Sequence, residues 1–177
     1  EVIKYALIMD SEFLNWLEKN IPAMMALDLT VLGTAVKRCC DYKAEVVAQD
    51  ERESGVRALL NFGHTFGHVI ETHEGYGNWL HGEAVAAGMV QAAELSQKLG
   101  WLSVEDVERV KRLLTLANLP IKPPAIATAT ALNLMGHDKK VKGGKIRLIL
   151  LKSLGEAVLT EDFDDASLTE VLSQYHQ

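Results

Sequence analysis

The feature of this sequence that most constrains its fold is an alanine-rich, strongly apolar segment over residues 81–99. Gly100 follows it, as a glycine commonly follows the C-terminal end of a helix. Apolar residues recur at helix-like spacings over residues 1–20, 24–49 and 56–74 as well. We therefore predict a mainly α-helical, multi-helix fold.

Several residues predict where these helices begin and end. Pro22 suits the first turn of a helix, and Ser103 with Asp106 forms a capping box for a helix reaching about Ala117. Residues 24–49 predict one long helix or two adjoining helices. Residues 50–55 and 75–78 are expected to be loops, and shorter helices are expected near residues 128–135 and 164–175.

A single region favours β structure. Residues 145–151 and 156–160, joined around Gly155, predict one small β-hairpin near residues 145–160. No strand is followed by a GxGxxG turn, so we do not expect this chain to bind a dinucleotide by itself. Residues 1–177 are predicted to form a single α-helical metal- and substrate-binding domain.

Composition excludes several classes of protein. The 177 residues are 48% hydrophobic with a formal net charge of −6, and their basic residues are scattered, so we expect no nucleic-acid partner. No apolar run has the roughly 18 to 20 residues that span a bilayer, and no secretory leader is visible. The adjacent Cys39 and Cys40 are expected to be buried or half-buried thiols in a reducing cytoplasm.

Histidines carry the strongest chemical signal. His64 and His68 are four residues apart and would share one face of a helix. His81 follows a glycine-containing loop that could bring it back beside His64. The spacing resembles the HExxH metal motif without its glutamate, which disfavours peptide hydrolysis by that mechanism. Carboxylates that could complete a metal site are Glu1, Glu53, Glu71 and Glu83.

Plainer interpretations compete with a site. A single histidine on a helix is more often a packing residue than a ligand, but three among glycines, an asparagine and a tryptophan favour a metal or acid–base site of undefined reaction. Lys4 is most simply a solvated helix residue. Weak surface salt bridges could be the role of Lys43, Arg52, Glu53 and Arg57, and residues 138–140 could be a loop charge cluster.

The motifs together resemble a known family. DERE, then GxRxLLNFGHTFGH, then GYGNWLHGEAVAAGM and finally DKK are similar to the 3-dehydroquinate synthases, and EVIKYALI resembles the helix that opens their C-terminal domain. The family converts 3-deoxy-D-arabino-heptulosonate 7-phosphate to 3-dehydroquinate and phosphate. It uses NAD transiently and a divalent metal, zinc or cobalt.

The resemblance implies a role for each matched residue. The implied metal ligands are Glu1, His64 and His81. His68 is implied in proton transfer and Glu53 as a catalytic-site carboxylate. The implied substrate contacts are basic or amide side chains: Lys4, Lys43, Arg57, Asn61, and one of Lys139 and Lys140.

The resemblance also implies what lies outside this sequence. The family's NAD-binding Rossmann-like domain is absent, and the sequence opens at Glu1 within a helical pattern and without an initiator methionine. We expect the isolated chain to fold but to be inactive, and the full-length protein to be a homodimer acting on a small sugar phosphate. Two alternatives stay open. One is another sugar-phosphate cyclase, such as a 2-deoxy-scyllo-inosose synthase, and the other is a non-catalytic helical metal-binding module.

Overall fold

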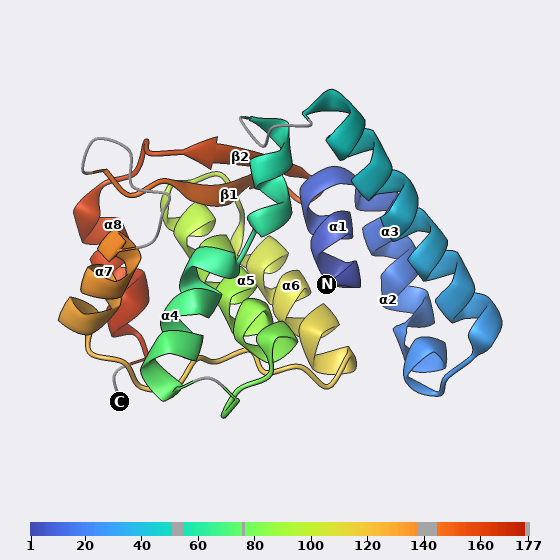
Figure 1. Ribbon diagram of the computed structural model, residues 1–177, viewed down its shortest axis with the longest axis horizontal. Helices are drawn as coiled ribbons and strands as arrows, with labels where there is room; N and C mark the ends of the chain where they lie inside the picture. Colours follow the sequence, from blue (N-terminus) through green and yellow to red (C-terminus); the bar gives the residue numbers. More distant parts are fainter. Residues whose placement is uncertain (51–54, 76, 138–144, 176–177) are drawn as a thin grey trace.

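The computed structural model describes residues 1–50, 55–75, 77–137 and 145–175, and it confirms a mainly helical fold (Figure 1). Within these described residues, one sheet is present, and its two strands are antiparallel. The elements in chain order are α1 (Val2–Met9), α2 (Ser11–Met25), α3 (Leu29–Gln49), the 3-10 helix η1 (Val56–Asn61), α4 (His64–Glu74), α5 (His81–Lys98), α6 (Val104–Leu116), α7 (Thr128–His137), β1 (Leu148–Ser153), β2 (Glu156–Thr160) and α8 (Asp165–Ser173).

Asp10 divides the first predicted helix into α1 and α2. Its backbone is extended, and its carboxylate accepts hydrogen bonds from the backbone N–H groups of Glu12 and Phe13 at 2.8 and 2.9 Å. This is an N-terminal cap, which satisfies donors that lack a partner within the helix. The prediction that Pro22 starts a helix is wrong. The cap has already set the start of α2, and Pro22 lies inside that helix. Its fixed φ suits a helix, which continues only to Met25.

Two other observed helix boundaries differ from the predicted ones for similar reasons. Asp28 caps α3 through the N–H groups of Thr30 and Val31, so the long helix begins at Leu29 rather than at residue 24. The segment 56–74 is not continuous, because Gly63 adopts a left-handed φ of +78° between η1 and α4. The capping box of Ser103 is confirmed, as is the helix that it opens.

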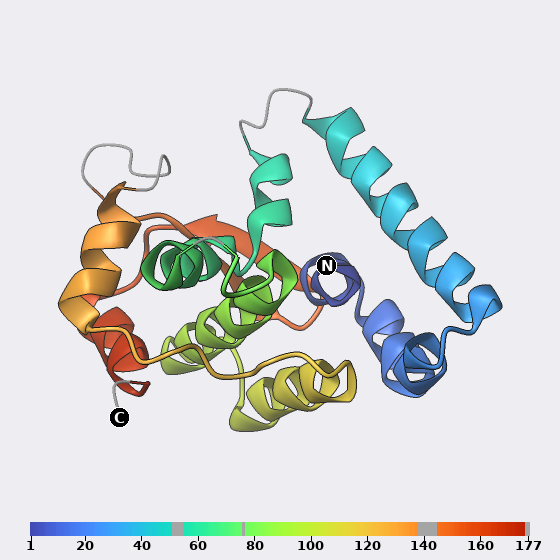
Figure 2. The same ribbon diagram turned by 60° about the horizontal axis from the view of Figure 1, so that its bottom comes forward.

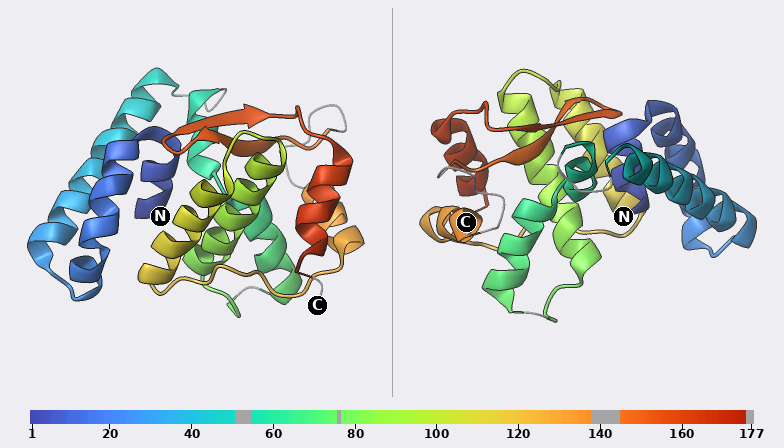
Figure 3. Two further views of the ribbon diagram at one scale, coloured as in Figure 1. Left: turned by 180° about the vertical axis from the view of Figure 1, so that it is seen from behind. Right: turned by 45° about the horizontal axis from the view of Figure 1, so that its top comes forward.

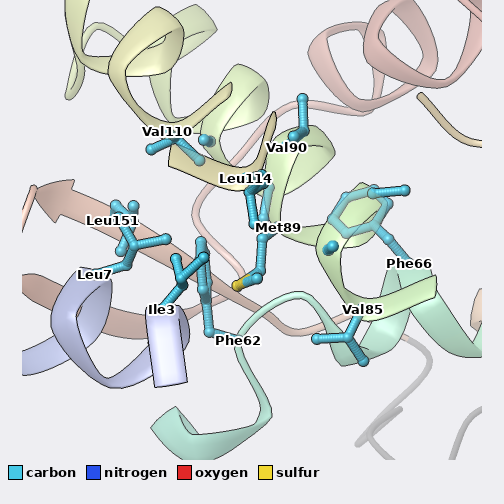
Figure 4. Packing of buried hydrophobic residues seen from close by; sticks show 14 of the residues in the cluster. Ile3, Leu7, Phe62, Phe66, Val85, Met89, Val90, Val110, Leu114 and Leu151 are labelled. Carbon is cyan, nitrogen blue, oxygen red and sulfur yellow. The ribbon is translucent and has the colours of Figure 1, made fainter. Parts of the chain in front are cut away.

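The predicted apolar helix α5 forms the centre of the molecule. Every residue from 84 to 96 is buried, because α4, α6, α8 and β1 pack around this helix (Figure 1). Figure 4 shows side chains of α1, α4, α5, α6 and β1 in one hydrophobic cluster. A helix that is covered on all sides needs no polar face, which explains its alanine-rich sequence.

Three glycines bring α4 and α5 into close contact. A Cβ at Gly88 would lie 2.2 Å from the carbonyl oxygen of Gly63 and 2.8 Å from the backbone nitrogen of Gly67. A Cβ at Gly67 would in turn lie 3.2 Å from backbone atoms of Ala84 and Val85. The two backbones therefore touch directly, and this contact fixes the first residues of α4 and α5 relative to each other.

The predicted hairpin is confirmed, with its first strand beginning at Leu148 instead of residue 145. Figure 3 shows it running across α5. The backbone N–H of Leu151 donates to the Ser96 hydroxyl of α5 at 3.0 Å. At the turn, the N–H of Gly155 donates to the carbonyl oxygen of Leu7 in α1 at 2.9 Å. The hairpin thus joins the central helix to the first one.

Helix α3 lies along the edge of the molecule and is the least covered of the long helices (Figure 2). Its buried residues are Ala35 and Val46. The expectation for the thiols is half right. Cys39 is half-buried and burial raises its pKa to about 11, whereas Cys40 is exposed because it lies on the open side of α3.

Among the helices of the described residues, none combines the length and the apolar character needed to cross a membrane.

Candidate metal centre

Three candidate ligands come from the starts of three helices. Glu1 immediately precedes α1, His64 is the first residue of α4, and His81 is the first residue of α5. One carboxylate oxygen of Glu1 lies 3.6 Å from Nε2 of His64 and 3.8 Å from Nε2 of His81. The candidate ligand atoms of the three residues all lie within 4.8 Å of one another. Two imidazoles and one carboxylate are a donor set that divalent zinc accepts while keeping a position open.

The hydrogen bonds on the far side of each imidazole favour metal binding. Nδ1 of His64 is 3.1 Å from the carbonyl oxygen of Phe62, and Nδ1 of His81 is 2.9 Å from a carboxylate oxygen of Glu71. A carbonyl oxygen can only accept, so His64 carries a proton on Nδ1, and the neutral form of the ring then has its lone pair on Nε2. His81 is oriented in the same way, with its Nδ1 facing the carboxylate of Glu71. Nε2 of both rings therefore faces Glu1.

Glu1 is held as a carboxylate. The neighbouring His64 imidazole, followed by Lys4, keeps the pKa of the Glu1 carboxyl well below its usual range. Nζ of Lys4 donates to the second oxygen of Glu1 at 2.5 Å. Lys4 is only 4% exposed, so the plain reading of a solvated lysine is wrong. It lies on the inward side of α1, where its charge is paired with Glu1.

A pocket of about 230 Å³ opens to solvent and is lined by two of the candidate ligands, Glu1 and His64. Basic and amide side chains from α1, α3 and η1 contribute to its wall, together with Tyr5 and Leu60. It brings together the predicted substrate contacts that the structure describes: Lys4, Lys43, Arg57 and Asn61. Three basic side chains in one wall suit an anionic ligand, because guanidinium and ammonium groups bind carboxylate and phosphate oxygens.

His68 lies one turn along α4 from His64. Its ring centroid is 5.9 Å from that of His64 and 6.4 Å from that of His81. It is exposed and lies outside the three-residue ligand group, next to it rather than in it. The predicted residues Glu53, Lys139 and Lys140 lie outside the described part of the chain.

Two residues of the site were not singled out from the sequence. Glu71 was recognised only as an available carboxylate, and its contact with His81 was missed. Its position seven residues after His64 on one helix was the available signal, because that spacing returns to the same face. Tyr5 in the pocket wall had no such signal. Glu83, another available carboxylate, instead caps α5 by accepting from the N–H of Leu80 at 3.0 Å.

Fold and site together define the class of protein: a mainly helical chain that presents a candidate divalent-metal centre beside a basic pocket. Residues 1–141 match the family described as 3-dehydroquinate synthase C-terminal, and the chain belongs to this family.

Similar proteins agree with this family. The chain is 82% identical over 175 residues to a 3-dehydroquinate synthase of Psychrobacter arcticus, covering 99% of the chain and 45% of that protein. It is 54% identical over 177 residues to the chloroplastic 3-dehydroquinate synthase of Solanum lycopersicum, covering 99% of the chain and 40% of that protein. The chain thus spans less than half the length of these two relatives.

Solved structures show the same fold. One is a 2-epi-5-epi-valiolone synthase of Streptomyces hygroscopicus with NAD⁺ and Zn²⁺ bound, with a TM-score of 0.87 and 24% identity, covering 98% of this chain and 49% of that one. Another is a 2-deoxy-scyllo-inosose synthase complexed with carbaglucose-6-phosphate, NAD⁺ and Co²⁺. Its TM-score is 0.69 with 27% identity, covering 81% of this chain and 42% of that one.

Proposed function

We propose that this chain is the C-terminal, metal-carrying half of a 3-dehydroquinate synthase. The whole enzyme would convert 3-deoxy-D-arabino-heptulosonate 7-phosphate to 3-dehydroquinate and phosphate, in the shikimate route to aromatic amino acids. The observation that carries the proposal is the convergence of Glu1, His64 and His81 beside a pocket walled by basic residues. The family and the names of the close relatives support it.

The donor set fits a divalent metal, with Glu1, His64 and His81 as its ligands. Both imidazoles have their Nδ1 atoms engaged elsewhere, which leaves Nε2 of each ring to bind the metal, and Glu1 is held as a carboxylate. When bound, the metal would polarise hydroxyl and carbonyl oxygens of the substrate as a Lewis acid. Zinc or cobalt is proposed, in line with the Zn²⁺ and Co²⁺ of the two cyclase structures.

The basic wall would hold the charged ends of the substrate. Lys4, Lys43 and Arg57, which line one pocket, would bind carboxylate and phosphate oxygens, and Asn61 would bind hydroxyl groups. Fixing both ends restricts the open-chain intermediate to the conformation that closes the ring in the final aldol step. His68, exposed beside the ligands, would move protons. Glu53, with Lys139 or Lys140, is assigned to the site on family resemblance alone.

The redox step needs NAD, which we assign to a Rossmann-like domain elsewhere in the whole protein. NAD bound there would supply the reversible hydride transfer of the reaction, which also includes the elimination of phosphate. We further propose that residues 1–177 are one domain, that the whole enzyme is a homodimer in the cytoplasm, and that this chain alone is inactive.

Another sugar-phosphate cyclase is the second candidate, favoured by the shared fold of the inosose synthase. The three basic residues of the pocket favour a substrate that carries both a carboxylate and a phosphate. A non-catalytic metal module would instead call for a closed four-ligand site, and within the described residues the ligand group has three members.

The proposal is tested by turnover of the full-length protein. With NAD and zinc, we expect phosphate release and 3-dehydroquinate formation from 3-deoxy-D-arabino-heptulosonate 7-phosphate, and none from glucose 6-phosphate, which lacks the carboxylate. His64→Ala and His81→Ala should abolish both signals, whereas His73→Ala, on the same helix as His64, should keep them. Turnover of glucose 6-phosphate alone would favour the alternative that the protein is an inosose synthase.

A further inference from the structure

We propose that Glu71 is a positioning residue that holds the His81 imidazole in the orientation and tautomer needed for metal binding. The inference rests on the proposed function, because it assumes that His81 is a metal ligand. The inference concerns a residue that contacts a candidate ligand and is not itself a ligand: the carboxylate of Glu71 lies 2.9 Å from Nδ1 of His81.

The two candidate histidine ligands are held in different ways. The His64 side chain is 11% exposed and is hydrogen-bonded to a backbone carbonyl. The His81 side chain is 49% exposed and stands at the first residue of α5. Packing therefore constrains His64 strongly and His81 weakly. An exposed imidazole needs a specific partner to stay in one rotamer and one tautomer.

Glu71 is suited to be that partner. Its side chain is only 13% exposed, and it lies on α4 two helical turns after His64, on the side of α4 that faces the site. The contact of Gly67 and Gly63 with α5 fixes α4 in place, so the Glu71 carboxylate is presented from a rigid element. Because it engages Nδ1, it leaves Nε2 directed at Glu1, 3.8 Å away.

The position of Glu71 separates this role from that of a ligand. It contacts the ring nitrogen that faces away from Glu1, and it is not a member of the ligand group. A carboxylate that accepts from the distal N–H of a metal-binding histidine fixes its tautomer and increases its donor strength. Loss of such partners typically weakens metal binding by about 10- to 100-fold.

A matched pair on the same helix provides the control. Nδ1 of His73 is also 2.9 Å from a carboxylate oxygen, that of Glu74, and neither residue belongs to the site. We would measure zinc dissociation constants of the full-length protein by competition with a chromophoric chelator. Glu71→Ala should weaken zinc binding about 10- to 100-fold, Glu71→Gln should weaken it less because an amide oxygen still accepts, and Glu74→Ala should match the parent.

A second measurement separates positioning from loss of fold. In the metal-free protein, side-chain ¹⁵N NMR at a pH where His81 is neutral should show its proton on Nδ1 in the parent and on Nε2, at least in part, in Glu71→Ala. The His64 tautomer should not change. If the Glu71→Ala variant binds zinc as tightly as the parent, this inference alone is overturned. A parent that binds no zinc would overturn the metal centre and the inference together.

Discussion

The α4–α5 pair and the helix α3 both contribute to the same site but are built in opposite ways. The backbones of α4 and α5 touch at glycines, and α5 is covered on all sides. Helix α3 buries Ala35 and Val46 and leaves Leu29 and Val36 82% and 56% exposed. The first pair carries two candidate metal ligands, His64 and His81, whereas α3 carries Lys43 in the pocket wall.

The contrast follows the demands of each task. Metal binding tolerates deviations of only a few tenths of an ångström in ligand position, so the imidazoles are placed on rigid, buried elements. An ammonium group on a long flexible stem can adjust to a phosphate or carboxylate, so its helix need not be as tightly packed. Changes at the α4–α5 contact should therefore affect stability and metal binding together, whereas a change at Lys43, the pocket residue of α3, should affect substrate binding alone.

The largest effect is expected from one methyl group in the α4–α5 contact. In Gly88→Ala the new Cβ would lie 2.2 Å from the Gly63 carbonyl oxygen, a backbone atom that cannot turn aside. We expect the free energy of unfolding to fall by about 3 kcal/mol or more, and zinc binding to be lost. Chemical denaturation and a zinc titration measure both effects.

The control for this variant lies in α3. A Cβ at Gly33 would meet nothing within 4 Å. Gly33→Ala should therefore raise the free energy of unfolding by about 0.5–1 kcal/mol, because alanine loses less backbone entropy than glycine in a helix. Equal destabilisation by the two substitutions would contradict the contrast between the regions.

Lys43→Ala tests the expectation that the pocket residue of α3 affects substrate binding alone. Removing one charge-assisted hydrogen bond to the substrate should cost about 1.5–3 kcal/mol, roughly a 10- to 100-fold rise in KM. Zinc affinity and the free energy of unfolding should stay at the parent values. Lys37→Ala is the matched control. Lys37 lies on the same helix but does not line the pocket, and its Nζ is 2.6 Å from a carboxylate oxygen of Asp41. A rise in KM of the same size in both variants would refute a specific role for Lys43.

Ser96 in α5 allows a test of how burial affects the cost of losing a hydrogen bond. It donates to the carbonyl oxygen of Ala92 at 2.9 Å and accepts from the buried N–H of Leu151 at 3.0 Å. Ser96→Ala leaves that N–H without its acceptor, which should cost about 1–3 kcal/mol of unfolding free energy. Thr115 makes the same bond to the residue four before it, but on an exposed surface, so Thr115→Ala should change stability very little. Denaturant titration of both variants would show whether burial decides the cost.

Helix identity was predictable because it depends on local pattern, whereas several boundaries depend on single contacts. The alanine-rich segment, the Ser103 capping box and the hairpin around Gly155 carried their own signals. The division at Asp10 did not, because an aspartate becomes a cap only when the chain turns there. Gly63 interrupts its segment because α5 approaches it, and a sequence does not reveal that contact in advance.

The residues of the candidate site also divide into those that a local pattern indicated and those that depend on packing. The i, i+4 spacing of His64 and His68 and the return of His81 toward His64 were visible in the sequence, and the resemblance selected Glu1 from the four available carboxylates. The sequence carried only an indirect signal for the partner of His81, the position of Glu71 on the same helix face as His64, because Glu71 and His81 lie on different helices and meet only after α4 and α5 pack. Likewise the burial of Lys4 depends on how α1 is covered, which no local pattern encodes.

The smallest effect is expected at the ion pair between Arg109 of α6 and Glu18 of α2, 2.6 Å apart on the partly exposed surface. Hydrogen bonding from Arg109 lowers the pKa of Glu18 below 4.5 in the folded protein. A carboxyl with a depressed pKa stabilises the fold at pH values above its unfolded pKa, and this contribution disappears as the pH falls through the folded value. Arg109→Met should therefore lower the unfolding free energy by at most about 1 kcal/mol near neutral pH. The difference from the parent should shrink once the pH drops below about 4.5. Denaturation of both proteins over a pH series measures this, and a difference that grows in acid would contradict the assigned charge pairing.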